Sequence, residues 1–303
     1  MSASQSRPNF WKLQYRAAPY LFILPFILIL GVFLLYPMVR SISMSFEQAY
    51  GPGFFRHRGW DNYRFILSDR LFWLAVGNTL GFAVVFLFLQ IPLSLALAIL
   101  LNNKNLRFRN FFRLAFFSSH LVGQVFVAIL FILLLAPRRG LVNRAIGALF
   151  PTIGSEINWR GDPNFALPAL LIAALWLSVG YGMIYLLAAL QAVDRELYDA
   201  AEVDGAGKWS QFWHVTLPGI QPVVVFLLLV GTIGSLQLFE LPYVFFQGPG
   251  PNFRGMTIVM YLYETGFLSG DIGFAAAVGW MLFCLIFAVS LVQLKLTRAI
   301  AEA

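Results

Sequence analysis

Six long apolar runs set the main constraint on how this chain folds. A helix needs about 20 apolar residues to cross the hydrocarbon of a bilayer. Because lipid offers the backbone no hydrogen bonds, such runs cross it only as helices or closed barrels. The sequence therefore predicts an all-α integral membrane protein with six transmembrane helices, at 17–39, 73–101, 111–136, 166–190, 219–241 and 272–294.

The overall composition agrees with lipid as the main solvent. Hydrophobic residues make up 59% of the 303 residues and charged residues 12%, whereas soluble chains are about 25% charged. The net charge of +7 could suggest nucleic acid. However, the basic residues fall between apolar runs, as expected for loops that face phospholipid headgroups, and no nucleic-acid recognition motif accompanies them.

The residues that usually carry metal or redox chemistry are sparse. Cys284 is the single cysteine, which excludes a disulfide within the chain. His57, His120 and His214 are far apart and lack metal-ligand spacing. We therefore predict no metal site, no catalytic residue, no cofactor bound by this chain, and no enzymatic activity.

An even number of spans places both termini on one side of the membrane. The connection 102–110 is short and basic, which favours a cytoplasmic N-terminus by the positive-inside rule. The first apolar run is too long for a signal peptide and is expected to be retained. We expect a cytoplasmic segment 1–16, a transmembrane domain 17–298, and a tail 299–303.

Three long connections, 40–72, 137–165 and 242–271, fall on the predicted outer side. They could form a surface for an extracytoplasmic partner, or they could simply link helices. The sequence leaves both interpretations open.

The fourth connection, within 191–218, runs against the charge trend of cytoplasmic loops. Against two basic residues, Arg195 and Lys208, it carries five acidic ones: Asp194, Glu196, Asp199, Glu202 and Asp204. Good helix formers predict a short helix over 195–203, and Asp204-Gly205 is a turn signal.

A second short helix over 208–215 is predicted to place Trp209, Phe212 and Trp213 on one apolar stripe. Pro218 suits the start of the next membrane helix, where its missing amide needs no partner. Two short helices with acidic edges and aromatic side chains suit docking into a groove of a soluble partner. The alternative is a helix pair lying on the membrane surface, although such helices usually favour Lys and Arg.

This loop resembles the EAA loop of binding-protein-dependent importer permeases. The matching residues are Asp199-Ala200-Ala201, Asp204-Gly205-Ala206, Phe212, Thr216-Leu217-Pro218 and Pro222. The chain departs from the family in one place, because Asp199 stands where glutamate is usual. The shorter carboxylate puts in doubt the reach of any salt bridge to an ATPase arginine.

Other segments resemble the carbohydrate-uptake branch of this family, the maltose and glycerol-phosphate type, so that the likeness covers about 17–298. They are 37–46, Asn62-Tyr63, Asn78-Thr79, Arg113, 140–143, Trp176, Gln247-Gly248-Pro249 and 273–275. The run Gly248-Pro249-Gly250-Pro251 departs from the branch, which usually has two glycines and then proline there. This puts the detail of that outer loop in doubt.

The resemblance implies the type I ABC importer permease fold, with a cytoplasmic coupling helix between helices four and five. It implies half of a pathway for a sugar or sugar-like solute in a bacterial inner membrane. Expected partners are a second permease, for which we expect a different chain, two ATPase subunits that bind ATP and Mg, and an extracytoplasmic solute-binding protein. The coupling residues would be Asp199, Ala200, Ala201, Asp204, Gly205, Trp209, Phe212 and Pro218.

The translocation pathway is expected where helices four and five carry polar or small residues. Aromatic and hydroxyl side chains such as Tyr181, Ser178 and Ser235 suit a sugar-like solute. The candidate set, partly from the resemblance to the maltose-type relative, is Leu177, Ser178, Tyr181, Gly231, Ser235, Leu238 and Glu240. Glycines such as Gly231 and Gly234 could instead be packing contacts.

Two other transporter readings stay open at this point. One is an importer permease for a non-sugar solute. The other is an ion-coupled secondary transporter, which the lack of inverted repeats and of midplane carboxylates disfavours.

Overall fold

The computed structural model describes residues 10–49, 55–150 and 157–302. The chain forms two compact units. Unit 1 comprises Met1–Arg64 and Thr265–Trp280, and unit 2 comprises Phe65–Glu264 and Met281–Ala303.

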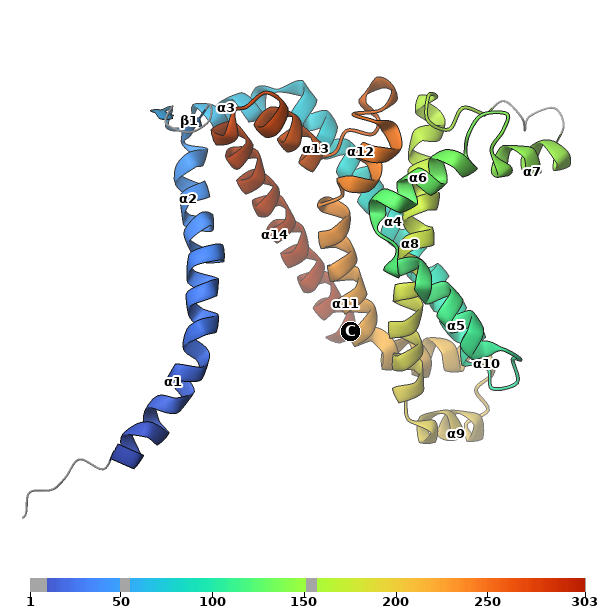
Figure 1. The fold of residues 1–303 in the computed structure, drawn as a ribbon. Coiled ribbons are helices and arrows are strands. Elements are labelled where there is room, and N and C mark those ends of the chain that lie inside the picture. The colour runs from blue at the N-terminus through green and yellow to red at the C-terminus, as the bar shows by residue number, and fades with distance from the viewer. Residues whose placement is uncertain (1–9, 50–54, 151–156, 303) are drawn as a thin grey trace, which may run out of the picture. The chain divides into compact units, whose positions relative to one another are not determined.

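Unit 1 begins with a long apolar helix. Helix α1 (Phe10–Leu30) passes through a π-turn at Gly31–Leu35 into α2 (Tyr36–Ser45), as Figure 1 shows. The most apolar window of the span Ala18–Ser45 is not buried against any other part of the described chain. Its side chains therefore remain available to lipid or to another subunit.

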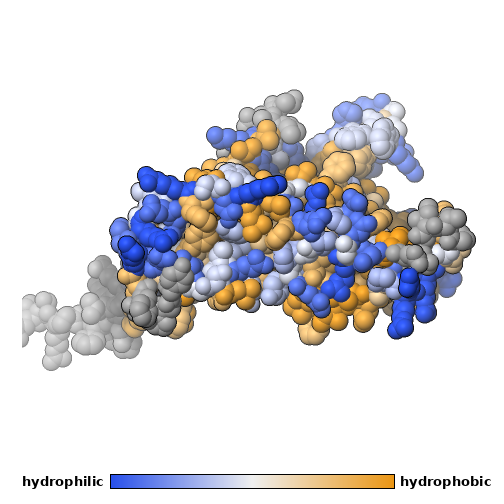
Figure 2. Space-filling view, turned by 90° about the horizontal axis from the view of Figure 1, so that it is seen from above, coloured by the Kyte–Doolittle hydropathy of each residue, from blue (hydrophilic) through white to orange (hydrophobic). Residues whose placement is uncertain are grey.

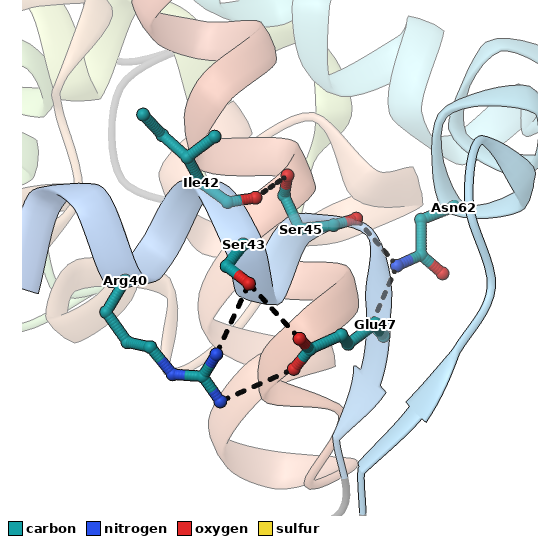
Figure 3. Close-up of polar contacts among 6 residues, drawn as sticks. All are labelled: Arg40, Ile42, Ser43, Ser45, Glu47 and Asn62. Carbon is teal, nitrogen blue, oxygen red and sulfur yellow. Dashed lines mark hydrogen bonds and ion pairs between the residues drawn. The ribbon is translucent and has the colours of Figure 1, made fainter.

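A polar clamp closes the end of α2 in unit 1. A short hairpin follows α2, in which β1 (Glu47–Ala49) pairs antiparallel with β2 (Phe55–His57). Asn62, in helix α3 (Asp61–Ser68), donates from Nδ2 to the carbonyls of Ser45 at 2.9 Å and Glu47 at 3.0 Å (Figure 3). Because one buried side-chain amide binds both backbone carbonyls, it fixes where the chain turns away from α2.

Unit 2 is a helical bundle whose two longest members, α4 and α8, lie side by side (Figure 1). Its helices are α4 (Arg70–Asn102), α5 (Arg109–Ser118), α6 (Gln124–Leu134), α7 (Leu141–Leu149), α8 (Pro163–Ala192), α9 (Arg195–Val203), α10 (Lys208–Gln211), α11 (Leu217–Leu236), α12 (Glu240–Phe246) and α13 (Ile258–Tyr263). Helix α14 (Ile272–Glu302) contributes residues to both units.

Two glycines of α8 allow it to pack closely on α5 and on α4. A Cβ added at Gly180 would lie 1.8 Å from the carbonyl oxygen of Phe116 in α5. One added at Gly182 would lie 2.6 Å from Ser94 Oγ, on α4. Small residues let membrane helices approach closely, so these positions specify how α8 packs on its neighbours.

The described residues contain five helices long and apolar enough to span a membrane, and a sixth span if α5 and α6 count as one. The predicted helix 111–136 is therefore wrong as a single helix. Its two parts meet at an angle of 104°. Ser118 and Ser119 donate their hydroxyls to the preceding turn, and Val122 and Gly123 adopt extended backbone. Serine hydroxyls that bind backbone carbonyls compete with the amide hydrogen bonds that would continue the helix.

The predicted fifth helix, 219–241, has wrong boundaries at both ends. It is continuous with α10 from Lys208 and ends at Leu236. Beyond the end, Phe239 leaves helical geometry, and α12 begins at Glu240. Pro242 favours the break, because it has no amide to donate to the carbonyl of Leu238, whereas in the first turn of α12 no such bond is needed.

The connections predicted on the outer side carry short helices of their own. In unit 2, Asn78 of α4 donates to the carbonyls of Phe253 at 2.7 Å and Met256 at 3.1 Å. Tyr261 donates its hydroxyl to Asp69 at 2.5 Å, and burial together with that bond raises the pKa of this phenol. In Figure 2, which views the molecule from above, hydrophilic residues lie among hydrophobic areas.

The predicted end segments fall partly outside the described residues. Of segment 1–16, residues 1–9 are not described, and α1 already includes Phe10. Of tail 299–303, residue 303 is not described, and α14 extends to Glu302.

Candidate functional site

A partly open cavity of about 330 Å³ lies in unit 2, lined mainly by α4, α8, α11 and the break between α5 and α6. Its wall is largely apolar with a few polar groups. The lining residues are Phe82, Phe86, Gln90, His120, Gln124, Ala174, Leu177, Ser178, Tyr181, Leu227, Val230, Gly231, Gly234, Ser235, Leu238 and Leu241. This mixture of an apolar wall and a few polar anchors is typical of sites for small molecules.

The cavity brings together six of the seven residues expected to line a pathway. Glu240 is the exception, because it is exposed at the first residue of α12 and does not line the cavity. The six that lie together are Leu177, Ser178, Tyr181, Gly231, Ser235 and Leu238.

The two serines of the cavity already use their protons within their own helices. Ser178 Oγ donates to the carbonyl of Ala174 at 2.8 Å, and Ser235 Oγ donates to that of Gly231 at 2.6 Å. Each hydroxyl oxygen keeps lone pairs that can accept a further hydrogen bond. The serines are therefore better placed to accept from a solute than to donate to it.

The two glycines of α11 differ from each other. A Cβ at Gly231 would lie 2.6 Å from the end of the Leu87 side chain, which is able to shift. A Cβ at Gly234 would meet nothing within 4 Å. The packing alternative therefore has some support at Gly231 and none at Gly234.

Three polar residues of the cavity wall were missed by the sequence reasoning. Gln90 Oε1 is buried and has no hydrogen-bond partner among the described residues. His120 packs its ring on Tyr181 with 4.6 Å between centroids, and Gln124 begins α6. The single glutamine in the apolar run 73–101 was a usable signal, since polar residues in membrane helices are costly. His120 and Gln124 line the cavity because the chain bends between α5 and α6, and the local sequence does not indicate this bend.

The acidic loop between α8 and α11 folds into the predicted short helix and turn. Helix α9 coincides with the predicted range 195–203. Asp194 caps its start by accepting from the amide of Glu196 at 3.1 Å. At its end Gly205 has φ of +79°, and its amide donates to Glu202 while the amide of Ala206 donates to Ala201. This pair of bonds is a Schellman motif, for which glycine is the favoured residue.

The second predicted helix of this loop is not separate. Residues 208–236 form one helix, with a π-turn at Phe212–Thr216 in which the amide of Leu217 donates to the carbonyl of Phe212. The wider turn accommodates Pro218, whose missing amide would otherwise leave a gap in the ladder. Pro218 is therefore inside the long helix, one turn from the loop. We call Asp194–Thr216 the knob.

Two side-chain bonds hold the knob together. Gln211 Nε2 donates to the carbonyl of Ala206 at 3.0 Å, across the turn. The hydroxyls of Tyr198 and Thr216 lie 2.9 Å apart and join α9 to the π-turn. The knob is thus fixed to the start of the long helix and does not hang from a flexible linker.

The predicted coupling residues lie at the surface of the knob, except Pro218, which lies just beyond it in α11. Asp199, Ala200, Asp204, Gly205 and Pro218 are exposed, and Ala201 and Phe212 are half-buried. Asp199 forms no ion pair with any described residue. Their role in coupling stays a prediction.

The aromatic residues of the knob form one exposed cluster. The ring of Trp209 lies 6.0 Å from that of Phe212 and 5.8 Å from that of Trp213, between centroids. Trp209 is 74% exposed and Trp213 is 48% exposed. Three aromatic rings that pack on one another and leave much of their surface exposed fit a docking site.

The described part of the chain contains no group of three or more His, Cys, Asp or Glu side chains that could hold a metal ion.

Comparison with known proteins gives consistent matches along the chain. A family model described as "Binding-protein-dependent transport system inner membrane component" matches residues 90–302. An arabinooligosaccharides transport system permease protein, AraP of Bacillus subtilis, is 38% identical over 93% of this chain and 89% of its own length. A lactose transport system permease protein, LacF of Rhizobium radiobacter, is 35% identical over 98% of this chain and 99% of its own length.

A solved structure is also similar over nearly the whole fold. It is a crystal structure of a bacterial alginate ABC transporter in complex with an alginate pentasaccharide-bound periplasmic protein. The match has a TM-score of 0.83 and 25% sequence identity, and it covers 98% of this chain and 99% of that chain.

Proposed function

The chain belongs to the family of inner membrane components of binding-protein-dependent transport systems, and we propose that it forms half of the pathway by which an ABC importer takes up a sugar or sugar-like solute. The observation that carries this proposal is the cavity between α4, α8 and α11. Carbohydrate permeases among the relatives support the solute class.

The chemistry of the cavity fits a solute with many hydroxyl groups. Sugars bind through apolar ring faces that pack on aromatic side chains and through hydroxyls that donate and accept hydrogen bonds. Phe82 and Phe86 supply stacked rings 5.5 Å apart, and Gln90 supplies an unpartnered acceptor. Ser178 and Ser235 supply further acceptors. The cavity lining contains no Asp, Glu, Lys or Arg side chain, which disfavours an ionic solute.

The energy for transport would come from elsewhere in a larger complex. Two separate ATPase subunits would bind ATP and Mg, so this chain itself would catalyse no reaction. Asp199 would pair with a basic residue of one ATPase, while Trp209, Phe212 and Trp213 fill a groove on it. Closure of the ATPases would then move the knob as a rigid body, and with it the helix that forms one cavity wall.

The other partners follow from the same family. An extracytoplasmic solute-binding protein would deliver the solute, in agreement with the periplasmic protein bound to the alginate transporter. A second permease, which we expect to be a different chain, would supply the other half of the pathway. The chain would lie in a bacterial inner membrane with both termini in the cytoplasm, which the basic connection at 102–110 supports.

Reconstitution tests the proposal. The permease pair, the ATPase and the binding protein are placed in liposomes, and uptake of labelled oligosaccharides is measured with and without ATP. We expect ATP-dependent uptake that requires the binding protein. Uptake that persists without the ATPase subunits but follows an ion gradient would show a secondary transporter instead.

A further inference from the structure

A second cavity of unit 2 lies at the far end of the bundle from α6 and α12, where α4 and α8 end and α5 and α9 begin. Its volume is about 670 Å³, and its lining is mostly polar. Four of its side chains are basic: Lys104, Arg109, Arg113 and Arg195. Asp199 is the single acidic residue of the lining, so the cavity carries an excess of positive charge.

These positive charges have no acidic partner within the described residues. The ion pairs within 4.0 Å there join Arg40 to Glu47 and Arg64 to Asp61, and none involves the cavity. Arg113 donates from Nη2 to the carbonyl of Leu101 at 2.7 Å, while its Nε is buried without a hydrogen-bond partner. A half-buried guanidinium with one unpartnered, buried N–H, within a cluster of like charges, is stabilised when an anion joins it.

The position of the cavity at the ends of two membrane-spanning helices indicates which anion binds there. Two membrane-spanning helices, α4 and α8, end at Asn102 and Ala192, beside the cavity. Lipid phosphates lie at this level of a bilayer, just beyond the hydrocarbon.

Helix α5 provides a matching surface for the lipid chains. Arg109 and Arg113 lie one turn apart and line the cavity. Phe111 and Leu114, on the same helix, are each 65% exposed. Basic residues beside exposed apolar ones form the amphipathic pattern that binds a charged headgroup and its acyl chains together.

We propose that this cavity binds the phosphate of an anionic phospholipid headgroup, held by Lys104, Arg109, Arg113 and Arg195, with the acyl chains along α5. The site does not depend on which solute the other cavity transports. The bound phosphate would neutralise the basic cluster beside Asp199, which leaves that carboxylate available to a partner.

The test uses the purified full-length permease in nanodiscs made of phosphatidylcholine with added phosphatidylglycerol. Retention of phosphatidylglycerol is measured by native mass spectrometry, because bound lipids remain on the protein and are identified by mass. The main variant is Lys104→Gln with Arg109→Gln, since neither side chain makes a hydrogen bond on which the fold depends. The matched control, Arg139→Gln with Arg144→Gln, removes the same charge near α7.

We expect the main variant to retain phosphatidylglycerol about tenfold more weakly or worse, because each basic residue near an anionic surface contributes about a fivefold effect. The control should bind like the unmodified protein. Equal weakening in both variants would show a general charge effect and overturn the site.

Two further measurements distinguish a bound lipid from free phosphate and from an acidic side chain of a partner. If inorganic phosphate displaces phosphatidylglycerol completely at physiological concentration, the ligand is free phosphate and the lipid assignment is wrong. If the main variant retains the lipid normally but no longer assembles with the ATPase, the basic cluster binds an acidic side chain of that partner, and the proposal is overturned.

Discussion

The knob and the cavity between α4, α8 and α11 are built in contrasting ways. The knob is specified by neighbours in the sequence: Asp194 caps α9, Gly205 ends it, and Gln211 closes the turn. The cavity is specified by residues from distant segments, brought together by helix breaks and by close helix contacts. The comparison teaches that a surface feature such as the knob can be encoded locally, whereas a cavity requires the whole bundle.

The largest expected effect is a loss of stability of the helix bundle, with the knob unchanged. Gly180→Ala forces a Cβ against the backbone of Phe116, and we expect a loss of about 3 kcal/mol or more in stability. The measurement is the thermal midpoint and the monodisperse fraction of purified protein. Gly234→Ala is the control, because its Cβ would meet open space. Equal midpoints for both variants would refute the close contact of α5 and α8.

The next effect should be confined to the knob. Asp199→Asn keeps the shape of the side chain but removes its charge, and a charged hydrogen bond contributes about 1.5–3 kcal/mol. We expect roughly 10- to 100-fold weaker binding of the ATPase, measured by titration in nanodiscs. Glu202→Gln, on the same helix, is the matched control. Asp199→Glu should retain binding, and its failure would show that the shorter side chain is required.

A smaller effect is expected from the turn of the knob. Gly205→Ala places a side chain at φ of +79°, which costs about 1–2 kcal/mol. ATP-dependent uptake should fall severalfold, while the thermal midpoint of the bundle stays unchanged. Gly207→Ala is the control, since φ there is −70° and a Cβ meets nothing within 4 Å. Normal uptake by Gly205→Ala would mean that the knob does not need this turn.

The smallest effects should rank the polar groups of the cavity. Gln90 has an unpartnered oxygen, whereas the proton of Ser178 already bonds within its helix. We expect Gln90→Leu to raise the half-saturating solute concentration about 5- to 10-fold and Ser178→Ala about twofold, because one neutral hydrogen bond contributes about 0.5–1.5 kcal/mol. Uptake kinetics in liposomes measure both. The reverse order would show that the serine is the main polar contact.

The same contrast explains what could be predicted from the sequence. Helix 195–203 was predicted to the residue, because its helix formers and the Asp204-Gly205 turn signal that ends it are neighbours in the sequence. The membrane spans of α4 and α8 followed from apolar length. The break between α5 and α6 did not, since Val122 and Gly123 give a weak local signal inside an apolar run. His120 and Gln124 were missed for that reason, while Gln90 could have been found.

The candidate pathway residues show the same limit. Six of them meet at one cavity because α8 and α11 pack face to face with α4. Glu240 was included on the expectation that the fifth helix continued to Leu241. The helix ends earlier instead, and Pro242 favours this because its ring cannot continue a helix without a kink. The Glu240 carboxylate therefore lies on α12.

The unbroken helix from Lys208 to Leu236 gives the molecule a mechanical property. At about 1.5 Å per residue it is about 43 Å long, with Trp209 near one end and Ser235 near the other. The π-turn at Phe212–Thr216 and Pro218 are the points at which it can bend. If the helix is held at one end, a tilt of about 5° displaces the opposite end by about 4 Å, about the width of a methyl group. A small tilt that starts at the aromatic end would therefore reshape the wall around a solute.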